Sequence, residues 1–377
     1  MQHSASTSNG KILTTLILIA SSSFLLSLFL IIWYVPVFSK LRNLYLCFTL
    51  VGGGAALILG WNGLAASKIS VISLINIPLI IFSSAAPLAA LEVLFSHVPV
   101  SHNSSHPLAQ QLWYRKYWKV NRWGFRDREH SDADLKRKHK VFIIGDSFVA
   151  GAGIKNTRDR FSDQLSRNLS SRNLVINLGR PGADTNIEYG ILSEFPVKPN
   201  VVIFSYYLND ILGTSSAQKY WSFSKGSGTG IQEWLASFSS KSFLFSFLYD
   251  SVSLASPVLS SPYFENLKEA YLDPKVFSDH LNEIEKVISF SQSNNAKLLV
   301  VIFPILQDLR GSAPIINKLG SFFEDKNIDV VQVADLVKDL SPSERIVNNQ
   351  DAHPSKIVHL RVADKLFAIL ENKFDID

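Results

Sequence analysis

Five apolar runs after residue 140, separated by loops and helical patterns, constrain the fold of this chain more than any other feature. The first run, VFII at 141–144, has no polar alternation, which is typical of a short strand buried on both faces. The other four runs are also mainly apolar. They span residues 174–179, 199–210, 296–304 and 329–336. Apolar strands that alternate with helices predict a parallel sheet covered on both faces.

The segments around these runs have helical periodicity. We expect helices at about 158–169, 186–194, 280–293, 315–325 and 359–373. In sheets built this way, functional residues gather just past the carboxyl ends of the strands. The residues that follow the runs are therefore the candidates for a functional site.

Ser147, Gly182 and Asn209 follow the first three runs, and Asp351 and His353 lie in a polar loop before the last helix. A serine hydroxyl becomes an effective nucleophile only when a base takes its proton, and a carboxylate can orient that base. Each residue also has a purely structural interpretation, because such residues are common in turns and helix starts. Their occurrence together, in this order, favours a nucleophile, a base and oxyanion donors at one sheet edge.

The N-terminal part of the chain has a different composition. Residues 1–100 contain only five charged side chains, Lys11, Lys40, Arg42, Lys68 and Glu92. A membrane crossing needs roughly 20 apolar residues, so we expect three transmembrane helices at about 12–34, 44–61 and 69–95. A signal peptide and buried core helices are the alternatives. The expected organisation is a membrane region at 1–98, a linker and lead-in at 99–140 and a catalytic domain at 141–377.

These spans predict a multi-pass membrane protein. The positive charges on the two sides of the spans nearly balance, and an inside N-terminus would place the catalytic domain outside the cytoplasm, in the periplasm of a Gram-negative host. The net charge of +5 is concentrated beside the apolar segments, without the basic stripe of a nucleic-acid-binding protein. We therefore expect no nucleic-acid partner. Cys47 is the only cysteine, which excludes an intramolecular disulfide.

Four sequence blocks resemble those of the SGNH/GDSL hydrolase family. They are GDSF at 145–148, NLGRPGADT at 177–185, YYLND at 206–210 and DAHPS at 351–355. The similarity covers roughly 120–372 and includes the lead-in VNRWGFRD at 120–127. It implies a flavodoxin-like three-layer α/β/α sandwich with a parallel sheet, the SGNH hydrolase fold, and a serine hydrolase that acts on ester bonds.

The resemblance also assigns roles to the candidate residues. Ser147 would be the nucleophile, His353 the base and Asp351 its orienting partner. The backbone amides of Ser147 and Gly182 and the side chain of Asn209 would form the oxyanion hole. No cofactor and no metal are implied, because the histidines of the linker and lead-in lack ligand spacing and there is no CxxC pair.

The chain departs from the family pattern at two positions. The third block usually has glycine where Tyr207 stands, which would reshape the pocket. The last block usually places its aspartate three residues before the histidine, whereas Asp351 precedes His353 by two. Asn348, Asn349 or a backbone carbonyl could therefore orient His353 in its place.

The function expected from these features is that of a membrane-anchored serine esterase. It would remove or transfer an O-acyl group, with acetyl expected first, on a cell-envelope glycan or a lipid-linked sugar. The expected partners are an acylated carbohydrate or lipid substrate, the lipid bilayer and components of polysaccharide assembly. The alternatives are a phospholipase or lysophospholipase and a non-catalytic glycan-binding component of such an assembly.

Two segments lack a role in this scheme. Residues 214–275 are an insertion relative to a minimal sandwich, for which we expect a packed helix with a lid-like loop; a surface resting on the bilayer is the alternative. The aromatic and basic stretch at 112–130 could bind lipid headgroups or pack under the next domain, and we expect packing.

Overall fold

The computed structural model describes residues 89–97, 107–220, 241–246, 261–348, 351–374 and 376. The chain divides into two compact units, Met1–Leu94 and Phe95–Asp377. Only residues 89–94 of the first unit are described, and the second unit contains the sheet.

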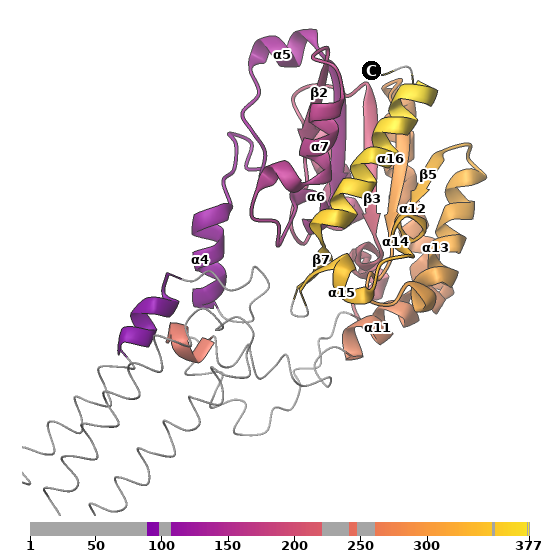
Figure 1. Ribbon diagram of the computed structural model, residues 1–377. Coiled ribbons are helices and arrows are strands. Elements are labelled where there is room, and N and C mark those ends of the chain that lie inside the picture. Colours follow the sequence, from indigo (N-terminus) through magenta and orange to yellow (C-terminus); the bar gives the residue numbers. More distant parts are fainter. Residues whose placement is uncertain are drawn as a thin grey trace, which may run out of the picture. The chain divides into compact units, whose positions relative to one another are not determined.

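A five-stranded sheet with strand order β2-β1-β3-β4-β5 forms the middle layer of the second unit (Figure 1). Every pair of neighbouring strands in it is parallel, as the apolar runs predicted, and the order is that of flavodoxin-like folds. The strands are β1 (His139–Gly145), β2 (Asn173–Asn177), β3 (Val201–Tyr207), β4 (Lys297–Phe303) and β5 (Asp329–Gln332).

Helices cover both faces of this sheet, because successive strand residues point to opposite faces. Phe142 and Ile144 of β1 belong to one core with α8, α12 and α13, whereas Val141 and Ile143 belong to a second core with α7, α14 and α16. All four side chains are fully buried. The helices are α7 (Phe161–Asn168), α8 (Thr185–Glu194), α12 (Pro274–Ser293), α13 (Leu309–Glu324), α14 (Val333–Val337) and α16 (Lys356–Phe374).

Short elements connect these layers. The chain enters through a helix and a short turn of helix before β1, and a small antiparallel hairpin precedes the last helix. These elements are α4 (Pro107–Tyr117), α5 (Asp132–Arg137), α6 (Ser147–Ala150), η2 (Thr157–Asp159), η3 (Leu208–Gly213), η4 (Ser215–Ala217), α11 (Ser261–Leu272), α15 (Pro342–Arg345), β6 (Ile346–Asn348) and β7 (Asp351–Pro354).

The last apolar run does not form a strand over its whole length. The prediction of a strand at 329–336 is correct only as far as Gln332, after which the chain continues as α14. Val333 and Val337 are both fully buried, and their spacing of four residues places them on one side of a helix. A short apolar run cannot distinguish this arrangement from a buried strand.

The predicted membrane localisation is wrong. None of the described helices combines the length and hydrophobicity that a membrane crossing needs. The longest of them, α12 with 20 residues and α16 with 19, carry charged side chains along their length. The multi-pass topology and the extracytoplasmic placement of the catalytic domain are withdrawn. Two of the proposed spans, 12–34 and 44–61, and residues 69–88 of the third lie outside the described residues.

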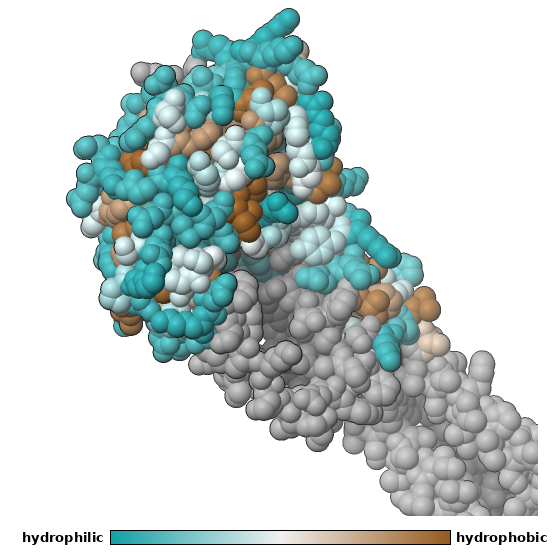
Figure 2. Space-filling model, turned by 180° about the vertical axis from the view of Figure 1, so that it is seen from behind, coloured by the Kyte–Doolittle hydropathy of each residue, from teal (hydrophilic) through white to brown (hydrophobic). Residues whose placement is uncertain are grey.

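The surface seen from behind is mainly hydrophilic, with hydrophobic residues in separate patches (Figure 2). Exposed large apolar side chains occur on several elements, including Ile187 on α8, Leu272 at the end of α11 and Ile357 and Leu360 on α16. Scattered apolar residues of this kind are normal on protein surfaces.

The aromatic and basic stretch at 112–130 packs into the second unit. Trp113 is only 1% exposed. The guanidinium of Arg126 lies 5.3 Å from the ring centre of Trp113 and 4.7 Å from that of Trp118, within the range of a cation–π contact. Of the two predicted roles, the structure therefore favours packing.

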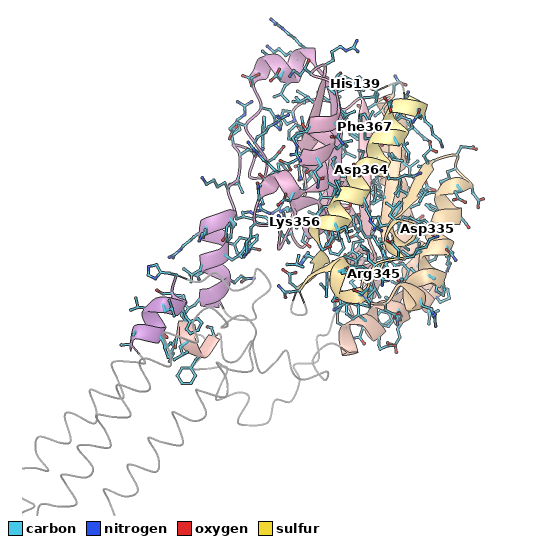
Figure 3. The ribbon with its side chains drawn as sticks, in the orientation of Figure 1. His139, Asp335, Arg345, Lys356, Asp364 and Phe367 are labelled. Atoms are coloured by element: carbon cyan, nitrogen blue, oxygen red, sulfur yellow. The ribbon has the colours of Figure 1, made fainter. Side chains whose placement is uncertain are left out.

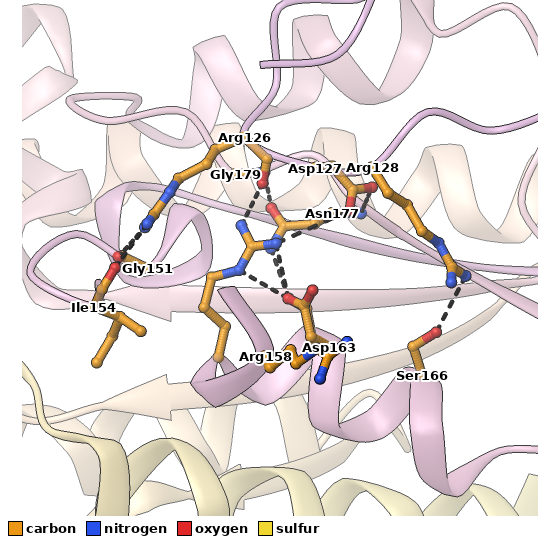
Figure 4. A network of polar contacts seen from close by, with 12 residues as sticks. Arg126, Asp127, Arg128, Gly151, Ile154, Arg158, Asp163, Ser166, Asn177 and Gly179 are labelled. Carbon is orange, nitrogen blue, oxygen red and sulfur yellow. Dashed lines mark hydrogen bonds and ion pairs between the residues drawn. The ribbon is translucent and has the colours of Figure 1, made fainter. Parts of the chain in front are cut away.

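Arg126 ties this lead-in segment to the loop that follows α6 (Figure 4). Its Nη1 donates to the carbonyls of Ala150 at 3.3 Å and Gly151 at 2.5 Å. Its Nη2 donates to the carbonyls of Tyr117 at 3.0 Å and Ile154 at 2.7 Å. Buried carbonyls need donors, and a forked guanidinium supplies several at once.

We expect Arg126→Lys to lower the free energy of unfolding by about 3 kcal/mol, because one ammonium cannot reach carbonyls on both sides of the fork. Urea unfolding measures the change. Arg128→Lys is the matched control: Arg128 is exposed and its side chain donates to Ser166 Oγ at 3.2 Å, so its effect should stay within about 0.5 kcal/mol. Equal effects of the two substitutions would contradict the structural role of Arg126.

Candidate active site

Ser147 is the first residue of the short helix α6, directly past the carboxyl end of β1. Asp146 caps this helix, and its Oδ1 accepts the backbone N–H of Phe148 at 2.8 Å. The turn needs glycine at position 145, because a Cβ there would lie 2.7 Å from the carbonyl oxygen of Ser205 and closer still to Val149. The local sequence therefore places the serine at the sheet edge.

The structure brings His353 and Asp351 next to Ser147, although 206 residues separate Ser147 from His353 in the sequence. His353 Nε2 is 2.8 Å from Ser147 Oγ, and His353 Nδ1 is 2.5 Å from Asp351 Oδ1. Asp351 is fully buried, whereas the His353 side chain remains 14% exposed. The three side chains form one continuous hydrogen-bonded chain that reaches the solvent side of the sheet edge.

The unusual two-residue spacing of Asp351 and His353 fits the hairpin β6–β7. Asp351 Oδ1 also accepts the backbone N–H of His353 at 3.2 Å, so a local turn holds the carboxylate next to its own ring partner. Arg345, at the start of the hairpin (Figure 3), donates to the carbonyls of Val337 at 3.1 Å and Leu306 at 3.3 Å. These bonds anchor the hairpin to the end of the sheet layer.

The second sequence block lies against the first. The backbone N–H of Arg180 donates to the carbonyl of Gly145 at 3.0 Å. A Cβ on Gly179 would lie 2.3 Å from the amide nitrogen of Ala150, so only glycine allows this approach. Gly182 follows in an exposed turn with φ of +74°, a conformation that favours glycine. Its role as an oxyanion donor remains a prediction.

Asn209 lies in the turn η3, which continues from β3. Its Nδ2 donates to Asp146 Oδ2 at 3.4 Å, and Ser147 Oγ is also 3.4 Å from that oxygen. Burial raises the pKa of the Asp146 carboxyl. The structure therefore brings Asn209 to the same carboxylate as Ser147. No local sequence pattern indicates a role for Asp146, because Asp146 and Asn209 lie 63 residues apart in the chain.

Tyr207, which stands where the third sequence block usually has glycine, is buried in the core next to Phe148. Its ring stacks on that of Phe148 with centres 4.1 Å apart. Phe148 in turn meets the His353 ring edge to face at 5.4 Å. The two aromatic side chains fill space directly behind the nucleophile and the base.

Ser147, His353 and Asp351 lie in the order that acyl transfer would require of a nucleophile, a base and a carboxylate. The Ser147 hydroxyl can give its proton to His353 Nε2, and Asp351 can hold the Nδ1 proton of the ring. Within the described residues, no group of three or more histidine, cysteine, aspartate or glutamate side chains could hold a metal ion.

Among the residues that the structure describes, the side-chain oxygens of two further carboxyl groups, Glu188 and Asp210, have no hydrogen-bond partner. Both are 1% exposed. Burial, and secondarily the charges of neighbouring carboxylates, raise the pKa of each well above its ordinary value. We therefore expect the folded protein to hold protons on these groups where the unfolded chain releases them.

No family model matches the sequence, and no curated protein matches it. A lipolytic protein of the G-D-S-L family from Veillonella parvula is 11% identical, with a TM-score of 0.38 over 62% of this chain and 98% of its own. A protein of the same family from Desulfitobacterium hafniense is 17% identical, with a TM-score of 0.36 over 62% and 100%. A carbohydrate acetylesterase family member from Sinorhizobium meliloti is 13% identical, with a TM-score of 0.35 over 62% and 97%. These structures include members of the family that the four sequence blocks resemble.

The raised pKa of Glu188 predicts a pH-dependent stability. The contribution of a raised pKa is fully present below the unfolded value, about 4.3 for glutamate, and is lost as the pH rises through the folded pKa. Glu188→Gln cannot titrate, so its Tm relative to the wild type should increase as the pH is raised from 4 to 8. Calorimetry across this range measures the difference. Glu194→Gln, at the exposed end of the same helix, should show no such trend, and a pH-independent difference for Glu188→Gln would contradict the prediction.

Proposed function

We propose that this chain is a serine esterase that uses Ser147 as its nucleophile. The observation that carries the proposal is the hydrogen-bonded chain from Ser147 Oγ through His353 to Asp351, with distances of 2.8 and 2.5 Å. A merely structural serine at a helix start needs neither a histidine on its hydroxyl nor a buried carboxylate behind that histidine.

The geometry supports a two-step acyl transfer. In the first step His353 takes the proton of Ser147 Oγ, which bonds to the ester carbonyl carbon, and the ester C–O bond breaks as His353 returns the proton to the leaving alcohol. In the second step His353 takes a proton from water or a sugar hydroxyl, whose oxygen attacks the acyl carbon. The bond from that carbon to Ser147 Oγ then breaks as His353 returns the proton to Oγ. Asp351 holds the ring orientation and stabilises the imidazolium in both steps.

The developing oxyanion needs donors that are already in place. We assign this role to the backbone amides of Ser147 and Gly182 and to Asn209 Nδ2. The packing of the second block against the first, and the contact of Asn209 and Ser147 with one buried carboxylate, support the assignment because both features concentrate donors near Ser147 Oγ.

We propose a short acyl group, acetyl in the first instance, on a carbohydrate. The support for a short chain is bulk: Tyr207 replaces the usual glycine, and its stack with Phe148 fills space behind the nucleophile. The support for a sugar is the exposed, polar turn around Arg180 and Gly182 beside the site, which offers hydrogen-bonding groups to hydroxyls.

We expect Ser147→Ala to abolish both fluorophosphonate labelling and ester turnover while leaving the fold intact. His353→Ala should have a comparable effect on kcat, because the residues act as a unit. Asp351→Asn should retain more activity than either, because the ring can still reach Ser147. Labelling and steady-state kinetics measure these effects, with circular dichroism to confirm folding. Turnover at the wild-type rate by folded Ser147→Ala protein would refute the serine-esterase proposal.

A series of p-nitrophenyl esters tests the acyl group. We expect kcat/KM to be highest for acetate and to fall from butyrate to octanoate, because the stacked rings of Tyr207 and Phe148 leave little room for a longer acyl chain. A rise toward octanoate would instead support the lipase or phospholipase alternative. An unlabelled, inactive wild-type protein that binds glycan would support the non-catalytic alternative.

A further inference from the structure

The segment 214–275, an insertion relative to a minimal sandwich, supplies α11 and places it against the turn η3. Lys268 Nζ of α11 lies 3.2 Å from Oδ2 of Asp308, the residue that caps α13. This ion pair connects α11 to the start of α13. Asn209 lies within η3, so the insertion packs against the turn that carries the residue assigned as an oxyanion donor.

Four buried side chains extend this contact into an unbroken chain of hydrogen bonds behind the turn. The Tyr271 hydroxyl donates to the carbonyl of Leu208 at 2.9 Å and is also bonded to the hydroxyl of Tyr206. The Tyr206 hydroxyl lies 2.8 Å from His280 Nε2. His280 Nδ1 lies 3.1 Å from Glu283 Oε2. The chain thus runs from α12 through β3 and α11 to the turn.

The fixed acceptor at the turn sets the direction of the two bonds nearest to it. The carbonyl of Leu208 can only accept, so Tyr271 donates its single proton to it. Tyr206 must then donate to Tyr271. At the other end of the chain, His280 Nδ1 faces Glu283 Oε2 at 3.1 Å and Thr214 Oγ1 at 3.2 Å. The Tyr271 and Tyr206 hydroxyls both donate in the direction of the turn.

We propose that Tyr271 is a positioning residue for the esterase reaction. Its bond to the carbonyl of Leu208 fixes the peptide plane between Leu208 and Asn209, and with it the direction in which Asn209 presents its amide. The proposal rests on the proposed function, because Asn209 acts here as an oxyanion donor.

The test is a double-mutant cycle on the full chain with p-nitrophenyl acetate. Tyr271→Phe keeps the ring and removes the hydroxyl. It should lower kcat by up to about 10²-fold, because a small displacement of the Asn209 amide weakens its bond to the oxyanion, and KM should change little. Asn209→Ala should lower kcat by about 10²–10³-fold. In the Asn209→Ala background, Tyr271→Phe should have almost no further effect, because the group that it positions is gone.

Tyr206→Phe is the matched control, since it removes a buried hydroxyl from the same chain but leaves the bond to Leu208 in place. Its loss of stability should be comparable and its loss of kcat much smaller. The proposal is overturned if folded Tyr271→Phe keeps the wild-type kcat, if the two variants lose kcat equally, or if the effects of Tyr271→Phe and Asn209→Ala multiply. A folded wild-type chain with no esterase activity and no labelling at Ser147 would overturn the proposed function as well, which separates the two failures.

Discussion

Gly179 lies so close to α6 that any side chain on it would collide with the backbone amide of Ala150. This approach lets the loop after β2 bond to the end of β1, and Asn177 secures it by donating to the carbonyl of Val149 at 2.8 Å. The arrangement depends on two parallel strands that end at the same edge, where their loops meet. Once these two loops are joined, the position of Ser147 is fixed relative to the sheet.

The parallel sheet could be predicted from the sequence because its strands are buried on both faces. Residues 141–144 are apolar without interruption and fully buried, so hydrophobicity alone identified them. The same criterion failed at Val333, where α14 directly follows the last residue of β5. Hydrophobicity also gave the wrong localisation: no helix in the described part of the chain is long and apolar enough to cross a membrane.

The candidate site likewise contains residues that could be predicted from the sequence and residues that could not. Ser147, Asn209 and His353 follow strands or precede a helix in short polar blocks, so their positions could be predicted, and the structure brings the hydroxyl and the imidazole together. Tyr271 and His280 could not be found this way, because their partners lie 63 and 74 residues away and neither belongs to a recognisable block. Long-range hydrogen bonds between buried polar groups leave no local pattern, so only the folded chain reveals them.

The four carbonyl contacts of Arg126 determine how much of the chain must be present for the sheet domain to fold autonomously. A recombinant fragment beginning at β1 would lack this arginine and leave the carbonyls of Gly151 and Ile154 without their donor, a few residues from Ser147. The loop beside the nucleophile would then open to proteases even where the sheet itself had formed. A fragment that keeps this loop closed therefore has to begin upstream of Trp113, far along the chain from the segments that carry Ser147 and His353.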